Sequence, residues 1–259
     1  MEKQKAIVIN KDKCIGCGKC VGDCPGSKLK MVDGKAEFMF SRCIECGHCY
    51  AICPVGAVSM TNYPEGADEK AVSMTEIDSD KLLAAMKSRR SIRKFTAEDV
   101  SDEDVAKIIE AGRYCPTGTN AQDFSFIVLR SKKDEAEKEA VKLFRKAQKI
   151  ATPFSDYIKY FDIDDKFFFK DAPVVILVTS KGNTSGCLAS SYMELMAYNL
   201  GLGVLYSGFF VAAVKFSKKL SAMLEMDNGN KLVTCLVIGH PDVSYERIPP
   251  RKEAKVKYL

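Results

Sequence analysis

The chemistry of this chain starts with eight of its eleven cysteines, which stand in two runs of identical spacing. Each run reads C-x2-C-x2-C-x3-C-P, and every cysteine of the second run lies 29 residues after its counterpart in the first. Thiolate sulfur is the soft ligand that iron–sulfur clusters require, and this spacing lets one loop supply three ligands to one cluster. The pattern therefore predicts two [4Fe–4S] clusters. The eight cysteines are Cys14, Cys17, Cys20, Cys24, Cys43, Cys46, Cys49 and Cys53.

Two other uses of cysteine fit the pattern less well. Zinc ribbons use two C-x2-C pairs, not two runs of three close cysteines with a distant fourth. A disulfide framework is typical of secreted proteins, but the first residues lack the charged and then apolar start of a signal peptide. Free cysteines without a targeting segment indicate a reducing compartment, so we expect a cytoplasmic protein.

The N-terminal segment from about Ile7 to Met60 resembles the two-cluster bacterial ferredoxins. In that family the fourth cysteine of each run serves the other cluster. The resemblance thus implies one cluster held by Cys14, Cys17, Cys20 and Cys53, and another held by Cys24, Cys43, Cys46 and Cys49.

Charge and hydropathy exclude two classes of partner. Residues 1–60 carry nine Lys and Arg against six Asp and Glu, and two clusters of about 2− each would bring this segment to about −1. Residues 61–259 hold 30 basic and 28 acidic residues, without a basic stripe interleaved with aromatics. We therefore expect no nucleic-acid binding. No apolar run approaches the roughly 20 residues that cross a bilayer, so no membrane partner is expected either.

The remaining chain is long enough for a second domain with its own core. We expect a ferredoxin domain over residues 1–60, a linker over 61–79 and the second domain over 80–259. Asp80 and Ser101 are candidate N-caps of helices. Phe124–Leu129, Val174–Thr179 and Leu232–Ile238 read as strands buried on both faces, with helices at 132–150 and 188–200 between them. The predicted fold class is α+β, a sheet with helices on both faces.

The second candidate site begins with the basic segment Arg89-Arg90-Ser91-Ile92-Arg93. Two adjacent guanidinium groups and a hydroxyl can clamp a phosphate, because arginine offers paired donors to phosphate oxygens. A solvated basic turn at a helix C-terminus would explain the same segment. Three later segments support the clamp: Cys115–Gln122 with amide side chains, Gly201–Gly208 with small residues, and Arg247–Lys252 with more cations.

These four segments, in this order, resemble the FMN-dependent nitroreductase family from about Asp80 to Lys252. The resemblance implies an α/β/α three-layer sandwich and a homodimer with flavins at the subunit interface. It implies that the phosphate and ribityl chain lie on Arg89, Arg90 and Ser91, and that Arg93 approaches the pyrimidine side of the ring. The other implied contacts are Pro116, Thr117, Gly118 and Asn120, Leu205, Tyr206, Ser207 and Gly208, and Arg251 and Lys252.

The fusion predicts an enzyme that passes single electrons from two clusters to FMN and then an electron pair to a small acceptor. Nitroaromatics, quinones and activated double bonds are the expected acceptors. Many nicotinamide-using members carry a glutamate where this chain has Ser207, which favours electron supply from the clusters or a redox protein. The alternatives are an electron-transfer module for a protein partner, and a specialised reduction such as dehalogenation or enone reduction.

Seven aromatic residues between 150 and 170 have two interpretations. They form either a lid over a planar substrate or part of the core or dimer interface. The set is Phe154, Tyr157, Tyr160, Phe161, Phe167, Phe168 and Phe169.

Overall fold

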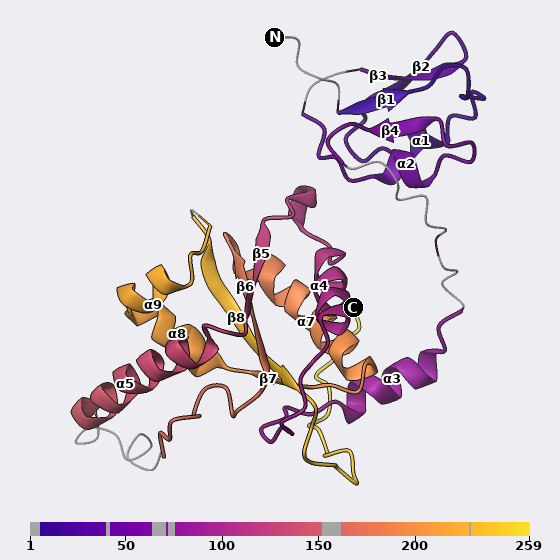
Figure 1. Cartoon of the computed structure of the whole chain (residues 1–259). Coiled ribbons are helices and arrows are strands. Elements are labelled where there is room, and N and C mark those ends of the chain that lie inside the picture. Colours follow the sequence, from indigo (N-terminus) through magenta and orange to yellow (C-terminus); the bar gives the residue numbers. More distant parts are fainter. Residues whose placement is uncertain (1–5, 40–41, 64–70, 72–75, 152–161, 228) are drawn as a thin grey trace. The chain divides into compact units, whose positions relative to one another are not determined.

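The computed structural model describes residues 6–39, 42–63, 71, 76–151, 162–227 and 229–259 (Figure 1). The chain divides into two compact units. The first comprises Met1–Ser73 with Thr117–Ala121, and the second comprises Met74–Pro116 with Gln122–Leu259. Across the described ranges, no helix combines the length and the apolar character needed to cross a membrane.

The first unit is built as a structural repeat. Its elements are β1 (Ile7–Ile9), α1 (Lys19–Gly22), β2 (Leu29–Val32), β3 (Lys35–Phe38), α2 (His48–Ala51) and β4 (Val58–Met60). Helix α2 lies 29 residues after α1, the same offset that separates the cysteine runs. Strand β1 pairs antiparallel with β4, and β2 pairs antiparallel with β3. Each small sheet therefore contains one strand from each repeat.

Backbone conformation follows the same repeat. Positive φ angles occur at Gly18 and Gly47, at Gly16 and Glu45, and at Ser27 and Gly56, each pair 29 residues apart. A left-handed backbone favours glycine, yet Ser27 and Glu45 adopt it where their partner positions carry glycine. At Gly16 no larger residue fits without a shift of the backbone, because a Cβ there would lie 2.2 Å from the carbonyl oxygen of Gly34.

The second unit contains a sheet of four antiparallel strands in the order β5-β6-β8-β7. The strands are β5 (Phe124–Leu129), β6 (Val174–Ser180), β7 (Gly203–Tyr206) and β8 (Lys231–Gly239). The helices are α3 (Ser79–Ser88), α4 (Asp102–Arg113), α5 (Lys133–Ala151), α7 (Asn183–Asn199), α8 (Gly208–Phe216) and α9 (Lys218–Met223). The three strands predicted from the sequence are confirmed.

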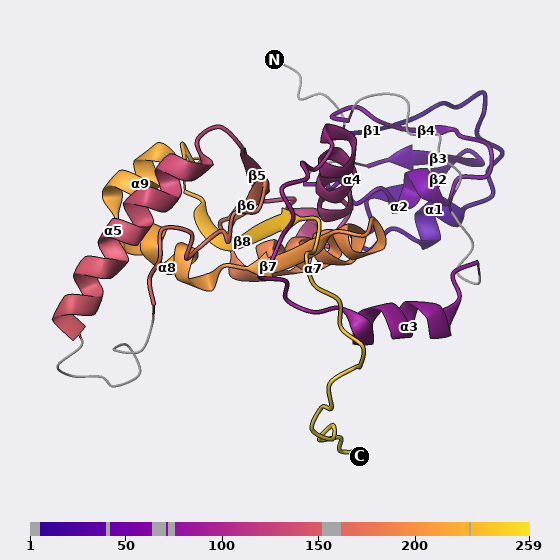
Figure 2. The same ribbon diagram turned by 60° about the horizontal axis from the view of Figure 1, so that its bottom comes forward.

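Helices cover both faces of this sheet. Figures 1 and 2 show α5, α8 and α9 on one side of the strands and α4 and α7 on the other. Along β6, Val175 and Leu177 pack into the hydrophobic core that α5, α8 and α9 cover. Ile176 and Val178 pack into the core that α4 and α7 cover, and all four side chains are fully buried. The predicted α+β fold with a sheet buried on both faces is confirmed.

The helix starts follow local capping chemistry. Ser101 caps α4, its hydroxyl accepting from the backbone N–H of Asp104 at 3.0 Å, as the sequence predicts. For α3 the cap is Asp78 rather than the predicted Asp80, because the Asp78 carboxylate accepts from the Lys81 N–H at 2.8 Å. Asp80 instead lies in the first turn, where the helix dipole also favours an acid.

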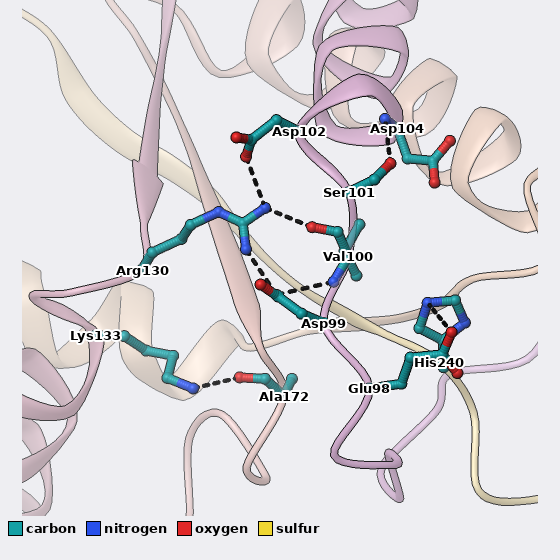
Figure 3. A network of polar contacts seen from close by, with 10 residues as sticks. All are labelled: Glu98, Asp99, Val100, Ser101, Asp102, Asp104, Arg130, Lys133, Ala172 and His240. Atoms are coloured by element: carbon teal, nitrogen blue, oxygen red, sulfur yellow. Dashed lines mark hydrogen bonds and ion pairs between the residues drawn. The ribbon is translucent and has the colours of Figure 1, made fainter.

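A polar network ties the end of β5 to the start of α4 (Figure 3). The Arg130 guanidinium donates to Asp99 at 2.7 Å, to the Val100 carbonyl at 2.6 Å and to Asp102 at 3.1 Å. Lys133 donates to the Ala172 carbonyl at 2.5 Å. The Arg130 bonds hold the segment before α4 against the end of β5, and the Lys133 bond ties the start of α5 to the chain before β6.

The described part of the aromatic segment belongs to the core. Phe168 and Phe169 are buried, and their backbone N–H groups donate to one Glu137 oxygen at 2.9 and 2.7 Å. Burial raises the pKa of Glu137, while these two bonds lower it. The core interpretation is therefore correct for Phe168 and Phe169. Phe154, Tyr157, Tyr160 and Phe161 lie outside the described residues.

The basic segment lies beside β7. The Ile92 N–H donates to the Val204 carbonyl at 3.0 Å, and Ser91 pairs with Val204 in a parallel bridge. Further along, the Asp242 N–H donates to the Lys94 carbonyl at 3.0 Å. The approach is so close that a Cβ on Gly203 would lie 2.6 Å from the Ile92 side chain.

Gly203→Ala should therefore destabilise the second unit by about 1–3 kcal/mol, because a stiff β-branched neighbour must move. Gly208→Ala is the matched control, since a Cβ there meets nothing within 4 Å. It should be neutral or stabilising by up to about 1 kcal/mol. The free energy of unfolding from denaturant titration measures both, and equal values would show that this close approach is not required.

Candidate functional site

The first cysteine cavity draws ligands from both runs. Cys14, Cys17 and Cys20 line it together with Cys53, and Ile9, Val55 and Val58 supply apolar walls. Cys53 comes from the second run but lies with the first, as the resemblance to ferredoxins implies. The structure thus brings together the four residues predicted to hold one cluster.

The second cavity has the reciprocal composition. Its cysteines are Cys43, Cys46 and Cys49 of the second run and Cys24 of the first. His48 lines this cavity at the position that Lys19 occupies in the first, 29 residues earlier. The eight predicted ligands are therefore divided four and four, each fourth cysteine crossing to the other cavity.

Backbone amides point at the sulfurs in both repeats. The Lys28 N–H donates to Cys24 Sγ at 3.2 Å, and the Ala57 N–H donates to Cys53 Sγ at 3.3 Å. Hydrogen bonds to sulfur are among the features that set cluster potentials. In the described residues no three side chains from Cys, His, Asp and Glu converge on one point as a single metal ion requires. A four-iron cluster needs another arrangement, because its thiolates bind separate iron atoms.

The third cysteine of each run lies where burial disfavours the thiolate form. Burial raises the pKa of Cys20, and it raises the pKa of Cys49 to about 11. By contrast, backbone N–H groups of Ala36 and Gly16 lower the pKa of Cys14. Iron binds thiolate, so binding at Cys20 and Cys49 must displace protons.

The second unit brings together two of the predicted flavin segments, the basic segment and the segment that contains β7. Ser91 and Ile92 pair with Val204 of β7. Strand β7 then leads through Leu205 and Tyr206 to Ser207, which is 7% exposed, and to the start of α8 at Gly208. The chain after β8 also contacts the basic segment, because the backbone N–H of Asp242 donates to the Lys94 carbonyl.

Arg89 and Arg90 are half-buried in a cavity between these segments. Its lining includes Gly201 and Gly203, and Tyr245 from the chain after β8. Arg89 is paired with Glu194 of α7, its Nη1 lying 2.7 Å from a carboxylate oxygen. A guanidinium pair lined by glycines suits a phosphate, because small residues leave room for its oxygens.

The other predicted flavin contacts stay predictions. Thr117, Gly118 and Asn120 are grouped with the first unit, where the Asn120 amide donates to the Glu45 carbonyl at 2.8 Å. Pro116 belongs to the second unit. Exposed positions are occupied by Arg93, Arg251 and Lys252.

Glu194 and strand β7 could not be predicted from the sequence. Glu194 lies in a helix whose neighbours are mostly small or apolar, and a lone acid there gives no signal of its partner Arg89, 105 residues earlier. Strand β7 is four residues long and begins with glycine, so its pattern is too short to read as a strand.

Comparison with known proteins identifies both parts of the chain. Residues 86–240 match the model of the nitroreductase family, which is more than half of the chain. The chain belongs to the nitroreductase family. Residues 6–54 of this nitroreductase-family protein match the 4Fe-4S dicluster domain.

Individual relatives of this nitroreductase-family chain are distant. An iodotyrosine deiodinase of Hydra vulgaris is 25% identical over 203 residues, covering 70% of this chain and 74% of the relative. An iodotyrosine deiodinase of Thermotoga neapolitana is 24% identical over 196 residues, covering 68% and 97%. The crystal structure of a Bacteroides fragilis nitroreductase with bound FMN shares the fold, with a TM-score of 0.58, 18% identity and coverage of 69% and 98%.

The crossed arrangement of cysteines makes a sharp prediction. Cys17→Ala with Cys53→Ala removes two ligands of one cavity and should leave about four irons per chain. Cys46→Ala with Cys53→Ala damages both cavities and should leave little iron. Iron and sulfide assays on anaerobically purified protein measure both. If the runs were uncrossed, the two double variants would exchange results.

Proposed function

We propose that this protein is an oxidoreductase that passes electrons from two [4Fe–4S] clusters to FMN and on to a small organic acceptor. One observation carries the proposal: a single chain combines two four-cysteine cavities with a half-buried arginine pair beside β7. Clusters exchange single electrons, and bound flavin supplies the conversion of single electrons to a pair.

The chain's own residues suit the phosphate end of FMN. Arg89 and Arg90 offer charge-assisted hydrogen bonds, each worth about 1.5–3 kcal/mol. Ser91 is fixed by its pairing with Val204, so its hydroxyl is held on a rigid element. The bound FMN in the B. fragilis nitroreductase, which shares this fold, supports the same choice of cofactor.

The clusters are the proposed entry point for electrons. Ser207 is a small residue at the position where, as the resemblance implies, many nicotinamide-using members carry a glutamate. It is buried at the start of α8. A cluster pair in the same chain makes a separate hydride donor unnecessary. A reduced redox protein is the proposed donor.

Reductive dehalogenation is the second candidate. Two curated relatives that match 70% and 68% of this chain are iodotyrosine deiodinases, at 25% and 24% identity. Removing iodide from an aryl ring also consumes an electron pair, so the proposed electron path serves either reaction.

We further propose a homodimer, since α3 leaves Leu82, Leu83 and Met86 exposed at 43%, 54% and 45%.

The test is reoxidation of the reduced holoprotein. The protein is first reduced with a stoichiometric amount of dithionite under argon. We then expect nitroaromatics or quinones to restore the absorbance of the oxidised protein in a single round of reoxidation. A parallel sample receives 3-iodotyrosine, with released iodide as the readout. NADH or NADPH alone should reduce the oxidised protein only slowly.

The controls separate the alternatives. Reoxidation by a nitroaromatic or quinone supports the first candidate. Release of iodide from 3-iodotyrosine that is faster than reoxidation by these acceptors supports the second. If no small acceptor reoxidises the protein but an oxidised ferredoxin does, the chain is an electron-transfer module instead. Rapid reduction by NADH would contradict electron entry through the clusters.

A further inference from the structure

Glu194 is a buried acid that the proposed electron path does not use. Only 11% of its side-chain surface is exposed, and 23% of that of Arg89. A buried charge is costly unless it is paired. The 2.7 Å contact with Arg89 Nη1 therefore satisfies Glu194 and fixes the arginine at the same time.

Two tyrosines, Tyr198 and Tyr206, lie close to Glu194. It lies on α7, and the same cavity wall continues through Tyr198 one turn later. Tyr206 of β7 donates its hydroxyl hydrogen to the Ser190 carbonyl at 3.0 Å, which ties β7 to this helix. Burial and then the negative charge of Glu194 raise the pKa of Tyr206, so the phenol stays neutral beside the carboxylate.

Among the residues that the structure describes, Glu194 is the one hydrogen-bond partner of the Arg89 guanidinium. A guanidinium has five N–H donors in a rigid plane. The contact with Glu194 uses an N–H of Nη1, and it does not involve Nε or Nη2. Because the side chain is already immobilised, its conformational entropy is lost during folding rather than during ligand binding. Arg89 lines a cavity that Arg90 and Gly201 also line.

We propose that Glu194 is a positioning residue for the flavin phosphate, holding Arg89 so that its free N–H groups meet the phosphate oxygens. This inference rests on the proposed FMN site. The competing role is simple charge neutralisation of Arg89. The two roles predict opposite signs, because an acid that only neutralises would repel the phosphate and its removal would tighten binding.

The experiment compares FMN with riboflavin, which lacks the phosphate. Isothermal titration calorimetry is performed on the full chain with its clusters, stripped of flavin under argon. In Glu194→Gln we expect FMN affinity to fall about three- to ten-fold, as one immobilised side chain is lost. Riboflavin affinity should stay within about two-fold, since that ligand does not use Arg89.

Two further variants serve as a test of geometry and as a control. Glu194→Asp keeps the charge but shortens the side chain, so it should also weaken FMN and spare riboflavin. Glu110→Gln removes the acid from another ion pair, with Arg113 at 2.5 Å on the surface of α4, and should change neither affinity. If Glu194→Gln does not fold, the Asp variant decides alone.

A double-mutant cycle tests whether Glu194 acts through Arg89. Arg89→Ala should weaken FMN by itself, and Glu194→Gln in that background should cause no further loss. FMN binding to Glu194→Gln that equals or exceeds that of the parent would overturn the positioning role. A parent chain that binds FMN no better than riboflavin would instead refute the proposed flavin site.

Discussion

The second unit depends on one close approach, that of the basic segment to β7. Ile92 donates to the Val204 carbonyl at 3.0 Å, and Gly203 leaves the space that the Ile92 side chain fills. This contact holds Arg89 and Arg90 at the edge of the sheet rather than on a mobile turn. Because β7 runs directly into Ser207 and α8, the same contact aligns the predicted phosphate end and the predicted ring end of the flavin site.

The first unit depends on reciprocity between its two repeats. Each cavity takes three cysteines from one run and the fourth from the other, and each two-stranded sheet takes one strand from each repeat. Neither repeat can complete a ligand set or a sheet alone. Cluster assembly and folding of this unit are therefore expected to be coupled, as in other small metal-binding domains.

Much of this could be predicted from the sequence where the signal is local. The cysteine spacing marks the eight candidate ligands, and continuous runs of β-branched residues locate β5, β6 and β8. The Ser101 cap follows from its side chain and the acids after it. For α3 the sequence predicts Asp80 as the cap and the structure has Asp78, because both aspartates are good N-caps and only the fold chooses between them.

Non-local pairing could not be predicted. Nothing in the sequence around Glu194 indicates that it pairs with Arg89, since the two are joined only when α7 packs beside the basic segment. The left-handed backbone at Glu45 and Ser27 is likewise imposed by the repeat and not by residue type.

The proposed electron path requires that clusters and flavin take up electrons together within one chain. A reductive titration of the anaerobically purified protein tests it most directly, with dithionite added in known amounts and both chromophores followed by absorbance. We expect uptake of about four electrons per chain, one for each cluster and two for FMN. Uptake of about two electrons, with only one kind of chromophore bleaching, would contradict it.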